Sequence, residues 1–248
     1  MTKINKVALI TGAARRVGAE IAHTLHAAGI NVILHYNRSE AEATRLCDLF
    51  NEERPNSACS LKADLEKIAN FDDLIKHATQ KWGHLDILVN NASRFHKTSV
   101  GQVTQEIWDN LMTNNLKAPF FLSQAAAEYL RQRQGCIVNI ADVHANRPMR
   151  DYGIYCISKA GLVMLTQTLA QELGPYVRVN AVSPGAVMWP EGENTLDDDY
   201  KKFIISRTAL HRHGTPKDIA KAVLYLVQDA DYVTGEVLTV DGGRSLSI

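Results

Sequence analysis

Short apolar segments alternate with helical segments along almost the whole chain, and this alternation limits the fold more than any other feature of the sequence. The apolar segments are rich in Val, Ile and Leu, which is typical of strands that are buried on both faces. Parallel strands need long crossover connections, and the helical segments between them supply these. The sequence therefore predicts an α/β protein with one doubly wound, seven-stranded parallel sheet and helices on both faces.

The boundaries of the expected elements follow from the same pattern. Strands are expected at 7–10, 31–36, 58–63, 87–89, 136–140, 177–182 and 237–240. Helices are expected from 17 to 28, from Ser39 onward, from 71 to 82, from Thr104 to about Arg131 with a division at Pro119, from 152 to 173, and from 217 to 227 after Pro216. Ser39 is expected to form a capping box with Glu42. Residues 1–248 are expected to form one domain. The segment at 185–215 is expected to be a substrate loop, because it interrupts the alternation of strands and helices.

Composition excludes several classes of function. The formal net charge is zero, whereas a nucleic-acid-binding protein needs a basic face. No apolar run approaches the ~18 residues of a membrane span, and the first residues do not resemble a signal peptide, so we expect a cytoplasmic protein. The cysteines form no C-x-x-C pair and are expected to be reduced thiols: Cys47, Cys59, Cys136 and Cys156. No metal site is expected, because His211 and His213 have no third ligand nearby.

Tyr155 and Lys159 are four residues apart, so they share one face of the expected helix. An ammonium group about 4 Å from a phenol favours the phenolate by roughly 4 kcal/mol at an effective dielectric constant of ~20. Such a cation would lower the pKa of Tyr155 from about 10 toward about 7, less the opposing effect of burial. The same spacing is also common on solvated helix faces. The pair predicts a catalytic acid only if other motifs agree.

A glycine-rich turn follows the first expected strand and contains Gly12 and Gly18. Backbone N–H groups and the helix dipole at such a turn can bind a pyrophosphate, although glycines also serve tight packing alone.

After the second strand, the sequence has no acid that would bind the ribose hydroxyls of NAD. It has Arg38 and Ser39 instead, and Arg16 lies in the turn. Guanidinium groups can bind a 2′-phosphate through paired hydrogen bonds, so we expect NADPH rather than NADH, the alternative being that Arg38 is an ordinary surface charge.

Five motifs resemble those of the short-chain dehydrogenase/reductase family: Thr11-Gly12, Asn90-Asn91-Ala92, Tyr155-x-x-x-Lys159, Pro184-Gly185 and Asp241-Gly242-Gly243. The resemblance implies a Rossmann-fold oxidoreductase that is usually a tetramer or a dimer. It implies that Tyr155 is the proton donor and that Lys159 binds the nicotinamide ribose and lowers the pKa of Tyr155. It also implies that Asn115 supports a proton-relay water.

Three departures from the general family pattern are similar to the pteridine reductases. Arg16 replaces the middle glycine of the turn, Ser93 replaces the glycine of Asn-Asn-Ala-Gly, and Asp142 replaces a serine thirteen residues before the tyrosine. The segment His35-Tyr36-x-Arg38-Ser39 and Phe95 resemble the same enzymes. An ionised Asp142 can only accept hydrogen bonds, which suits a substrate with N–H groups such as an aminopterin ring.

The resulting hypothesis is an NADPH-dependent reductase of dihydrobiopterin- or dihydromonapterin-like pteridines, with dihydrofolate as a further candidate. Tyr155 would protonate the ring nitrogen, and Phe95 would stack on the pterin unless it is a core or loop residue. One alternative is a 3-oxoacyl-(acyl-carrier-protein) reductase or another carbonyl reductase, which a carboxylate facing a carbonyl oxygen disfavours. Another is a catalytically silent scaffold with the same fold, which the intact Tyr155, Lys159 and Asn115 disfavour.

The expected sites contain the following residues. The catalytic residues are Asp142, Tyr155, Lys159 and Asn115. The cofactor site, for NADPH or NADP, contains Gly12, Arg16, Val17, Gly18, His35, Tyr36, Asn37, Arg38, Ser39, Asp64, Leu65, Asn91, Ala92, Ser93, Tyr155, Lys159, Pro184 and Gly185. The substrate site contains Arg16, Ser93, Phe95, Asp142, Tyr155 and Trp189.

Two further features concern the substrate loop and the assembly. Protozoal pteridine reductases have a serine where this chain has Val187, so a hydroxyl contact is missing there. Met188, Trp189 and Tyr200 could form an apolar wall, although Trp189 could equally pack against the sheet. The helix at 152–173 is apolar around much of its circumference, and by resemblance its outer face is a subunit interface of a homotetramer.

Overall fold

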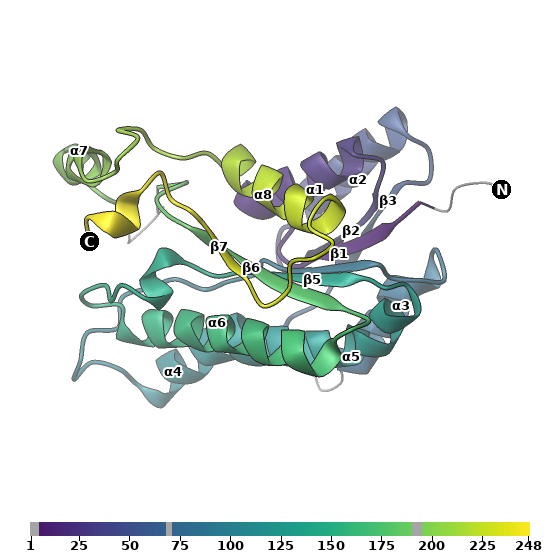
Figure 1. Ribbon diagram of the computed structural model, residues 1–248, viewed down its shortest axis with the longest axis horizontal. Coiled ribbons are helices and arrows are strands. Elements are labelled where there is room, and N and C mark those ends of the chain that lie inside the picture. Colours follow the sequence, from purple (N-terminus) through teal and green to yellow (C-terminus); the bar gives the residue numbers. More distant parts are fainter. Residues whose placement is uncertain (1–4, 68–70, 190–194) are drawn as a thin grey trace.

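In the computed structural model, seven strands form one parallel sheet in the order β3-β2-β1-β4-β5-β6-β7 (Figure 1). The structure describes residues 5–67, 71–189 and 195–248. The strands are β1 (Val7–Ile10), β2 (Asn31–Tyr36), β3 (Ala58–Lys62), β4 (Ile87–Asn90), β5 (Cys136–Ile140), β6 (Arg178–Pro184) and β7 (Val237–Val240). The strand order reverses between β1 and β4. In a doubly wound sheet this reversal opens a crevice at the carboxyl ends of the strands.

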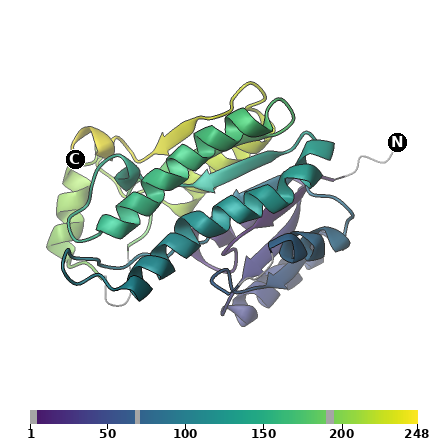
Figure 2. The same cartoon turned by 90° about the horizontal axis from the view of Figure 1, so that it is seen from below.

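Helices cover both faces of the sheet (Figure 1). One layer contains α1 (Arg16–Ala27), α2 (Glu40–Glu53) and α8 (Pro216–Gln228), and the other contains α3 (Phe71–Gln80), α4 (Gln105–Met112), α5 (Ala118–Gln132) and α6 (Gly153–Leu173). Figure 2 shows α5 and α6 side by side on the second layer. A further helix, α7 (Asp198–Ser206), lies beside the segment at 244–248 at one end of the molecule.

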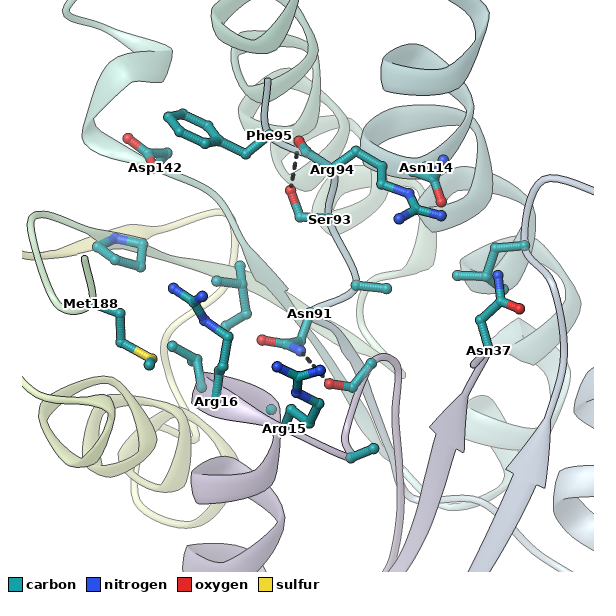
Figure 3. A pocket seen from close by; sticks show the side chains of 18 of the residues that line it. Arg15, Arg16, Asn37, Asn91, Ser93, Arg94, Phe95, Asn114, Asp142 and Met188 are labelled. Atoms are coloured by element: carbon teal, nitrogen blue, oxygen red, sulfur yellow. Dashed lines mark hydrogen bonds between the residues drawn. The ribbon is translucent and has the colours of Figure 1, made fainter. Parts of the chain in front are cut away.

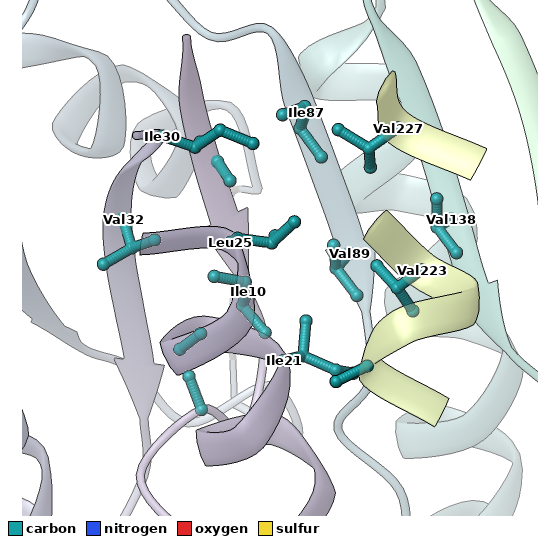
Figure 4. Close-up of a cluster of buried hydrophobic side chains, with 14 of the residues drawn as sticks. Ile10, Ile21, Leu25, Ile30, Val32, Ile87, Val89, Val138, Val223 and Val227 are labelled. Carbon is teal, nitrogen blue, oxygen red and sulfur yellow. The ribbon is translucent and has the colours of Figure 1, made fainter. Parts of the chain in front are cut away.

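Alternate residues of each central strand enter two separate hydrophobic cores. In β1, Ala8 and Ile10 pack toward α1 and α8, whereas Val7 and Leu9 pack toward the layer of α3, α5 and α6. Figure 4 shows the first core, in which Ile10 lies among residues of α1 and α8. Burying one such side chain contributes about 1.5–3 kcal/mol to folding. Both faces of the sheet are therefore needed for its stability, as in parallel sheets generally.

The predicted fold is confirmed, and each predicted strand is present with ends shifted by at most two residues. The capping box predicted for Ser39 is wrong: the residue is the N-cap of α2, but its side chain makes no capping hydrogen bond. Glu42 lies 4.0 Å from Arg15 instead of reaching back to the N-cap. A capping box occurs at α8, where the Asp218 carboxylate accepts a hydrogen bond from the backbone N–H of Thr215 at 2.8 Å.

The division predicted at Pro119 is also displaced. The interruption is a π-helical turn, Thr113–Lys117, and Pro119 lies in the first turn of α5. In a regular α-helix the proline ring would clash with the carbonyl group four residues earlier, that of Asn115. A wider π-helical turn relieves this clash without ending the helix.

The predicted substrate loop at 185–215 is only partly a loop. It contains α7, and residues 190–194 lie outside the described residues. Within the residues that the structure describes, no helix has both the length and the apolar character to cross a membrane.

Candidate active site

A cavity of about 680 Å³ lies at the carboxyl ends of the central strands, where the strand order reverses (Figure 3). Nearly all residues of the predicted sites line it: Gly12, Arg16, Val17, Gly18, His35, Tyr36, Asn37, Arg38, Ser39, Leu65, Asn91, Ala92, Ser93, Phe95, Asp142, Tyr155, Lys159, Pro184 and Gly185. Three predicted residues are not among the lining residues: Asp64, Asn115 and Trp189.

The glycine-rich turn after β1 is fixed by short contacts of its backbone. Gly12 has φ +63°, and a Cβ added at Gly18 would lie 2.2 Å from the Gly12 carbonyl oxygen. The Asn91 side-chain amide donates to the Thr11 carbonyl at 2.9 Å, and the Thr11 hydroxyl accepts from the backbone N–H of Asn91 at 2.9 Å. The turn between β1 and α1 is thus attached to the end of β4, and neither glycine has room for a side chain.

His35 attaches the same turn to β2 and to the end of β3. It is 2% exposed, and its Nδ1 accepts a hydrogen bond from the backbone N–H of Gly12 at 3.2 Å. Its Nε2 lies 3.2 Å from the carbonyl oxygen of Ala63, to which it donates in the tautomer that leaves Nδ1 as the acceptor. Burial lowers the pKa of His35 to about 4, against the opposing effect of the Ala63 carbonyl. The neutral imidazole therefore holds the turn in place at ordinary pH.

Four residues with cationic or hydroxyl side chains line the end of the cavity near β2: Arg15, Arg16, Arg38 and Ser39. Sequence analysis missed Arg15, although the Arg15-Arg16 pair was a visible signal. Arg16 has φ +56°, which is unusual for a residue other than glycine and explains why glycine is the ordinary residue at this position. One guanidinium nitrogen of Arg16 donates to the backbone carbonyl of Trp189 at 3.1 Å.

These residues fit a dinucleotide with phosphate groups. The glycines of the turn have no side chains that would cover the backbone N–H groups facing the cavity. The guanidinium groups supply charge-assisted hydrogen-bond donors. Carboxylate side chains are absent from the lining at the end of β2, where His35, Tyr36, Asn37, Arg38 and Ser39 stand. The donor set therefore suits a phosphate better than a pair of ribose hydroxyl groups.

At the other end of the cavity, Tyr155 is paired with a carboxylate. Its hydroxyl group donates to Oδ2 of Asp142 at 2.7 Å, and Oδ1 of Asp142 accepts from the backbone N–H of His144 at 2.8 Å. Burial raises the pKa of Tyr155 well above its ordinary value, and the Asp142 charge raises it further. The phenol is therefore held protonated.

The lowered pKa predicted for Tyr155 is wrong, and the position of Lys159 explains why. Both side chains do share one face of α6, but Nζ of Lys159 donates to the Ile140 carbonyl at 2.8 Å and lies 5.8 Å from the centroid of the Tyr155 ring. Burial lowers the pKa of Lys159 to about 8, although the Asp142 carboxylate raises it. The closest charged partner of the phenol is an anion rather than the expected cation.

The aromatic ring of Phe95 is not freely open on both faces. It stacks on Tyr152 at a centroid distance of 4.6 Å and an interplanar angle of 15°, and it meets Tyr155 edge-on at 4.8 Å. Phe95 lines the cavity and lies close to Asp142 in Figure 3. Sequence analysis missed the contact with Tyr152, which does not line the cavity but is stacked on the Phe95 ring.

Asn115 lies behind the cavity rather than in its wall. Its side-chain oxygen accepts from the backbone N–H of Arg94 at 2.7 Å and from the Ser93 hydroxyl at 3.1 Å. Its amide nitrogen donates to the Arg94 carbonyl and to the Ser158 hydroxyl, both at 3.0 Å. The side chain therefore fixes the segment after β4. Any contact of Asn115 with a relay water would have to come from its backbone carbonyl.

The other two predicted residues outside the lining have different partners. The Asp64 carboxylate accepts from the backbone N–H of Glu66 at 3.2 Å. The ring of Trp189 stacks on His213 at a centroid distance of 4.2 Å.

Residues that line the cavity but were absent from the predicted sites are Ala14, Arg15, Arg94, Asn114, Ile140, Ala141, Val187 and Met188. Within the described parts of the chain, no group of three His, Cys, Asp or Glu side chains could hold a metal ion.

Comparison with known proteins agrees with this architecture. The family model described as Enoyl-(Acyl carrier protein) reductase matches residues 12–245. Pteridine reductase 1 of Leishmania tarentolae is 34% identical over 97% of this chain and 96% of its own length. The 3-oxoacyl-(acyl-carrier-protein) reductase FabG of Staphylococcus epidermidis is 33% identical over 97% of this chain and 99% of its own length. An uncharacterized oxidoreductase of Methylorubrum extorquens is 34% identical over 98% of this chain. The chain therefore belongs to the short-chain dehydrogenase/reductase family and is an oxidoreductase of that family.

Proposed function

We propose that the protein is an NADPH-dependent reductase of pteridines, acting on dihydrobiopterin- or dihydromonapterin-like substrates and on dihydrofolate. The observation that carries the proposal is the hydrogen bond of 2.7 Å between the Tyr155 hydroxyl and the Asp142 carboxylate in the wall of the cavity. A carboxylate accepts hydrogen bonds and donates none, so it complements the N–H groups of an aminopterin ring. It would repel the oxygen of a carbonyl substrate.

The proposed chemistry divides between the cofactor and the chain's own residues. A nicotinamide cofactor held by the glycine-rich turn and the residues after β2 would supply the hydride for the carbon of a ring C=N bond. Tyr155 supplies a proton to the adjacent nitrogen, and a positioned general acid of this kind contributes ~10²–10⁴-fold to the rate. Asp142 accepts hydrogen bonds from the N–H groups of the substrate and so orients it. For a fully oxidised pterin, Asp142 helps relay the proton to the other ring nitrogen, in a separate reduction that consumes its own NADPH. Phe95 lines the cavity and offers an aromatic ring to the substrate, while Tyr152 covers another part of the Phe95 ring.

NADPH as the cofactor is supported by the cationic end of the cavity. Arg38 and Ser39 follow β2, at the place where the adenosine ribose lies in Rossmann folds. Arg15 adds a second guanidinium from the turn after β1. Together they provide the paired donors that a 2′-phosphate requires.

Reduction of a 3-oxoacyl thioester is the second candidate function, favoured by the similarity to the staphylococcal FabG protein. The two functions predict opposite effects for Asp142→Ser. As a pteridine reductase, the variant should lose one to three decades in kcat/KM, roughly the loss of a charge-assisted hydrogen bond together with the relay. As a 3-oxoacyl reductase, the variant should gain activity because a hydroxyl group can donate to the substrate oxygen.

The decisive experiment measures NADPH oxidation with dihydrobiopterin, dihydrofolate and an acetoacetyl thioester, for the natural protein and for Asp142→Ser. Asp231→Ser, at an exposed position in the loop before β7, is the matched control. We expect turnover of a pterin or of dihydrofolate that falls in Asp142→Ser alone. Turnover of only the thioester would reject the pteridine assignment, and a protein without any turnover would favour the scaffold alternative.

We also propose that the protein is a cytoplasmic homotetramer and that the segment at 185–215 contributes the substrate loop. The assembly is supported by large apolar side chains that remain exposed on the layer of α5 and α6: Phe120, Phe121, Ile157 and Met164. Light scattering after gel filtration tests the mass. Replacing Met164 with Glu should shift the mass toward smaller species, whereas a monomeric natural protein would contradict the proposal.

A further inference from the structure

One carboxylate oxygen outside the proposed catalytic group receives hydrogen bonds from three different segments. Oε1 of Glu66, in the loop after β3, accepts from Arg94 after β4 at 3.1 Å. It also accepts from the side-chain amides of Asn110 in α4 and Asn114 in the π-helical turn, each at 2.9 Å. The Glu66 cluster, defined as Glu66, Arg94, Asn110 and Asn114, therefore joins parts of the chain that are far apart in sequence.

The cluster differs from an ordinary surface ion pair in its burial and in the number of its donors. The side chains of Glu66 and Arg94 are 30% and 37% exposed, whereas those of the Lys62–Glu40 pair are 62% and 61% exposed. The Asn114 amide holds the pKa of Glu66 below its ordinary value, and Arg94 acts in the same direction against the effect of burial. The carboxylate is therefore ionised at neutral pH and attracts all three donors at once.

Arg94 is held at its backbone as well as at its guanidinium group. The backbone N–H and carbonyl of Arg94 are both hydrogen-bonded by the side chain of Asn115, at 2.7 and 3.0 Å. Arg94 and Asn114 line the cavity, and Figure 3 shows the Arg94 side chain extending toward Asn114. Residue 94 is thus clamped between the π-helical turn and the loop after β3.

The clamped residue directly precedes Phe95, whose ring meets Tyr155 edge-on at 4.8 Å. Asn115 also donates to the Ser158 hydroxyl, which lies in α6 between Tyr155 and Lys159. A continuous set of hydrogen bonds and one ring contact therefore runs from Glu66 to Tyr155. Loss of the Glu66 carboxylate would leave Arg94 without its anion and would remove an acceptor of Asn110 and Asn114, so the π-helical turn that carries Asn115, and with it the segment at 93–95, would be held less firmly.

We propose that Glu66 is a positioning residue: through Arg94 and Asn114 it fixes the segment at 93–95 and so sets the place of the Phe95 ring against Tyr155. Glu66 does not touch the reacting atoms. We expect its effect mainly at the substrate end of the cavity, because Glu66 makes no hydrogen bond with Thr11, Asn91 or His35, whose hydrogen bonds hold the glycine-rich turn.

The first test measures local order and needs no substrate. Hydrogen exchange of the amides at 93–97 is compared between the natural protein, Glu66→Ala and the control Glu128→Gln, which alters an exposed ion pair on α5. We expect faster exchange at 93–97 in Glu66→Ala, with exchange in α1 unchanged. Equal exchange at 93–97 in all three proteins would overturn the proposal.

The second test is a double-mutant cycle of Glu66→Ala and Arg94→Met, measured with whichever substrate the natural protein reduces. We expect Glu66→Ala to lower kcat/KM by roughly tenfold, the scale of a charged hydrogen bond, with the Kd of NADPH changed by less than about threefold. The loss in the double variant should be smaller than the product of the two single losses, because each single variant already removes the Glu66–Arg94 contact, while Glu66 keeps its contacts with Asn110 and Asn114 in Arg94→Met. Strictly additive effects would overturn the proposal.

Glu66→Gln separates positioning from stability. It keeps the acceptor oxygen but removes the charge, so its kcat/KM should lie between those of the natural protein and Glu66→Ala. A variant that is only less stable would show a lower Tm with unchanged kcat/KM well below that temperature, which would overturn the proposal. A natural protein that reduces the thioester and no pterin would reject the proposed substrate while leaving this cycle measurable.

Discussion

The two ends of the cavity are built in different ways. The end near α1 is fixed mainly by the backbone: a glycine turn without room for side chains, held by hydrogen bonds from Thr11, Asn91 and His35. The end near Asp142 is fixed by side chains from several segments, including Phe95, Tyr152 and Tyr155. A single substitution at the Asp142 end changes which group faces the cavity, whereas at the α1 end the backbone conformation of the turn depends on two glycines without room for larger residues.

The largest expected effect is a loss of turnover in Tyr155→Phe without a loss of NADPH binding. Tyr155→Phe removes the proton donor and should lower kcat by about 10²–10⁴-fold. The Kd of NADPH, measured by quenching of protein fluorescence, should stay within about threefold, because the glycine turn is untouched. If turnover survives, another group donates the proton; if NADPH binding is lost as well, the two ends are not independent.

Gly18→Ala tests the backbone end. The added Cβ would lie 2.2 Å from the Gly12 carbonyl oxygen and 2.5 Å from the Asn91 amide, and overpacking of this kind costs about 1–3 kcal/mol. We expect weaker NADPH binding by roughly tenfold to hundredfold, measured by titration. Gly153→Ala, where nothing lies within 4 Å of the added atom, is the control and should bind NADPH normally. Normal binding by Gly18→Ala would contradict a backbone-determined site.

Arg38→Met sharpens the comparison by changing a side chain at the cofactor end. Loss of a charge-assisted hydrogen bond to the 2′-phosphate should lower kcat/KM for NADPH by about tenfold or more, with kcat/KM for NADH nearly unchanged. Arg45→Met, on the exposed face of α2, is the control. Equal losses with both cofactors would mean that Arg38 does not select NADPH.

The smallest expected effect concerns the pH dependence of kcat/KM, which reports the groups of the free enzyme. The pKa of Lys159 is lowered by burial to about 8, so this group loses its positive charge as pH rises through about 8. The pKa of Tyr155 is raised, so the phenol stays protonated in that range. We therefore expect kcat/KM to fall by up to about tenfold for each pH unit above 8.

A companion variant assigns that loss of activity to Lys159. Asp142→Asn removes the carboxylate that raises the pKa of Lys159, so the loss of kcat/KM should begin at lower pH in the variant. A profile that is flat to about pH 10 in the natural protein would show that the ammonium charge is not required. An unchanged profile in Asp142→Asn would assign the loss to a different group.

Most of the fold followed from local pattern. The strands were predictable because each is a short apolar run, and their parallel order because helical segments separate them. The errors arose where a local signal competed with tertiary contacts. Ser39 has the sequence of a capping box, but Glu42 lies near Arg15 instead. Pro119 does indicate an interruption of the regular α-helix, but the interruption lies one turn earlier, as the π-helical turn Thr113–Lys117.

The sequence predicted which residues lie in the candidate site, but it did not predict their hydrogen-bond partners or the direction of their pKa shifts. Tyr155 and Lys159 share a helix face because of their spacing alone. The spacing did not reveal that the Tyr155 hydroxyl donates to Asp142 or that the Lys159 ammonium is bound by the Ile140 carbonyl. The Glu66 cluster was invisible for the same reason, since Glu66, Arg94 and the Asn110–Asn114 pair come from three separate segments of the chain.

By itself, the sequence determined the order of strands and helices, the glycine turn and the residues that gather at the ends of the strands. These depend on periodicity and on residue type, which are local properties of a chain. Only the tertiary structure decided which partner each polar group receives, and therefore that the Tyr155 phenol is kept protonated by burial and by Asp142. A pKa depends on the charges and burial within a few ångströms, and distant segments of the chain supply both.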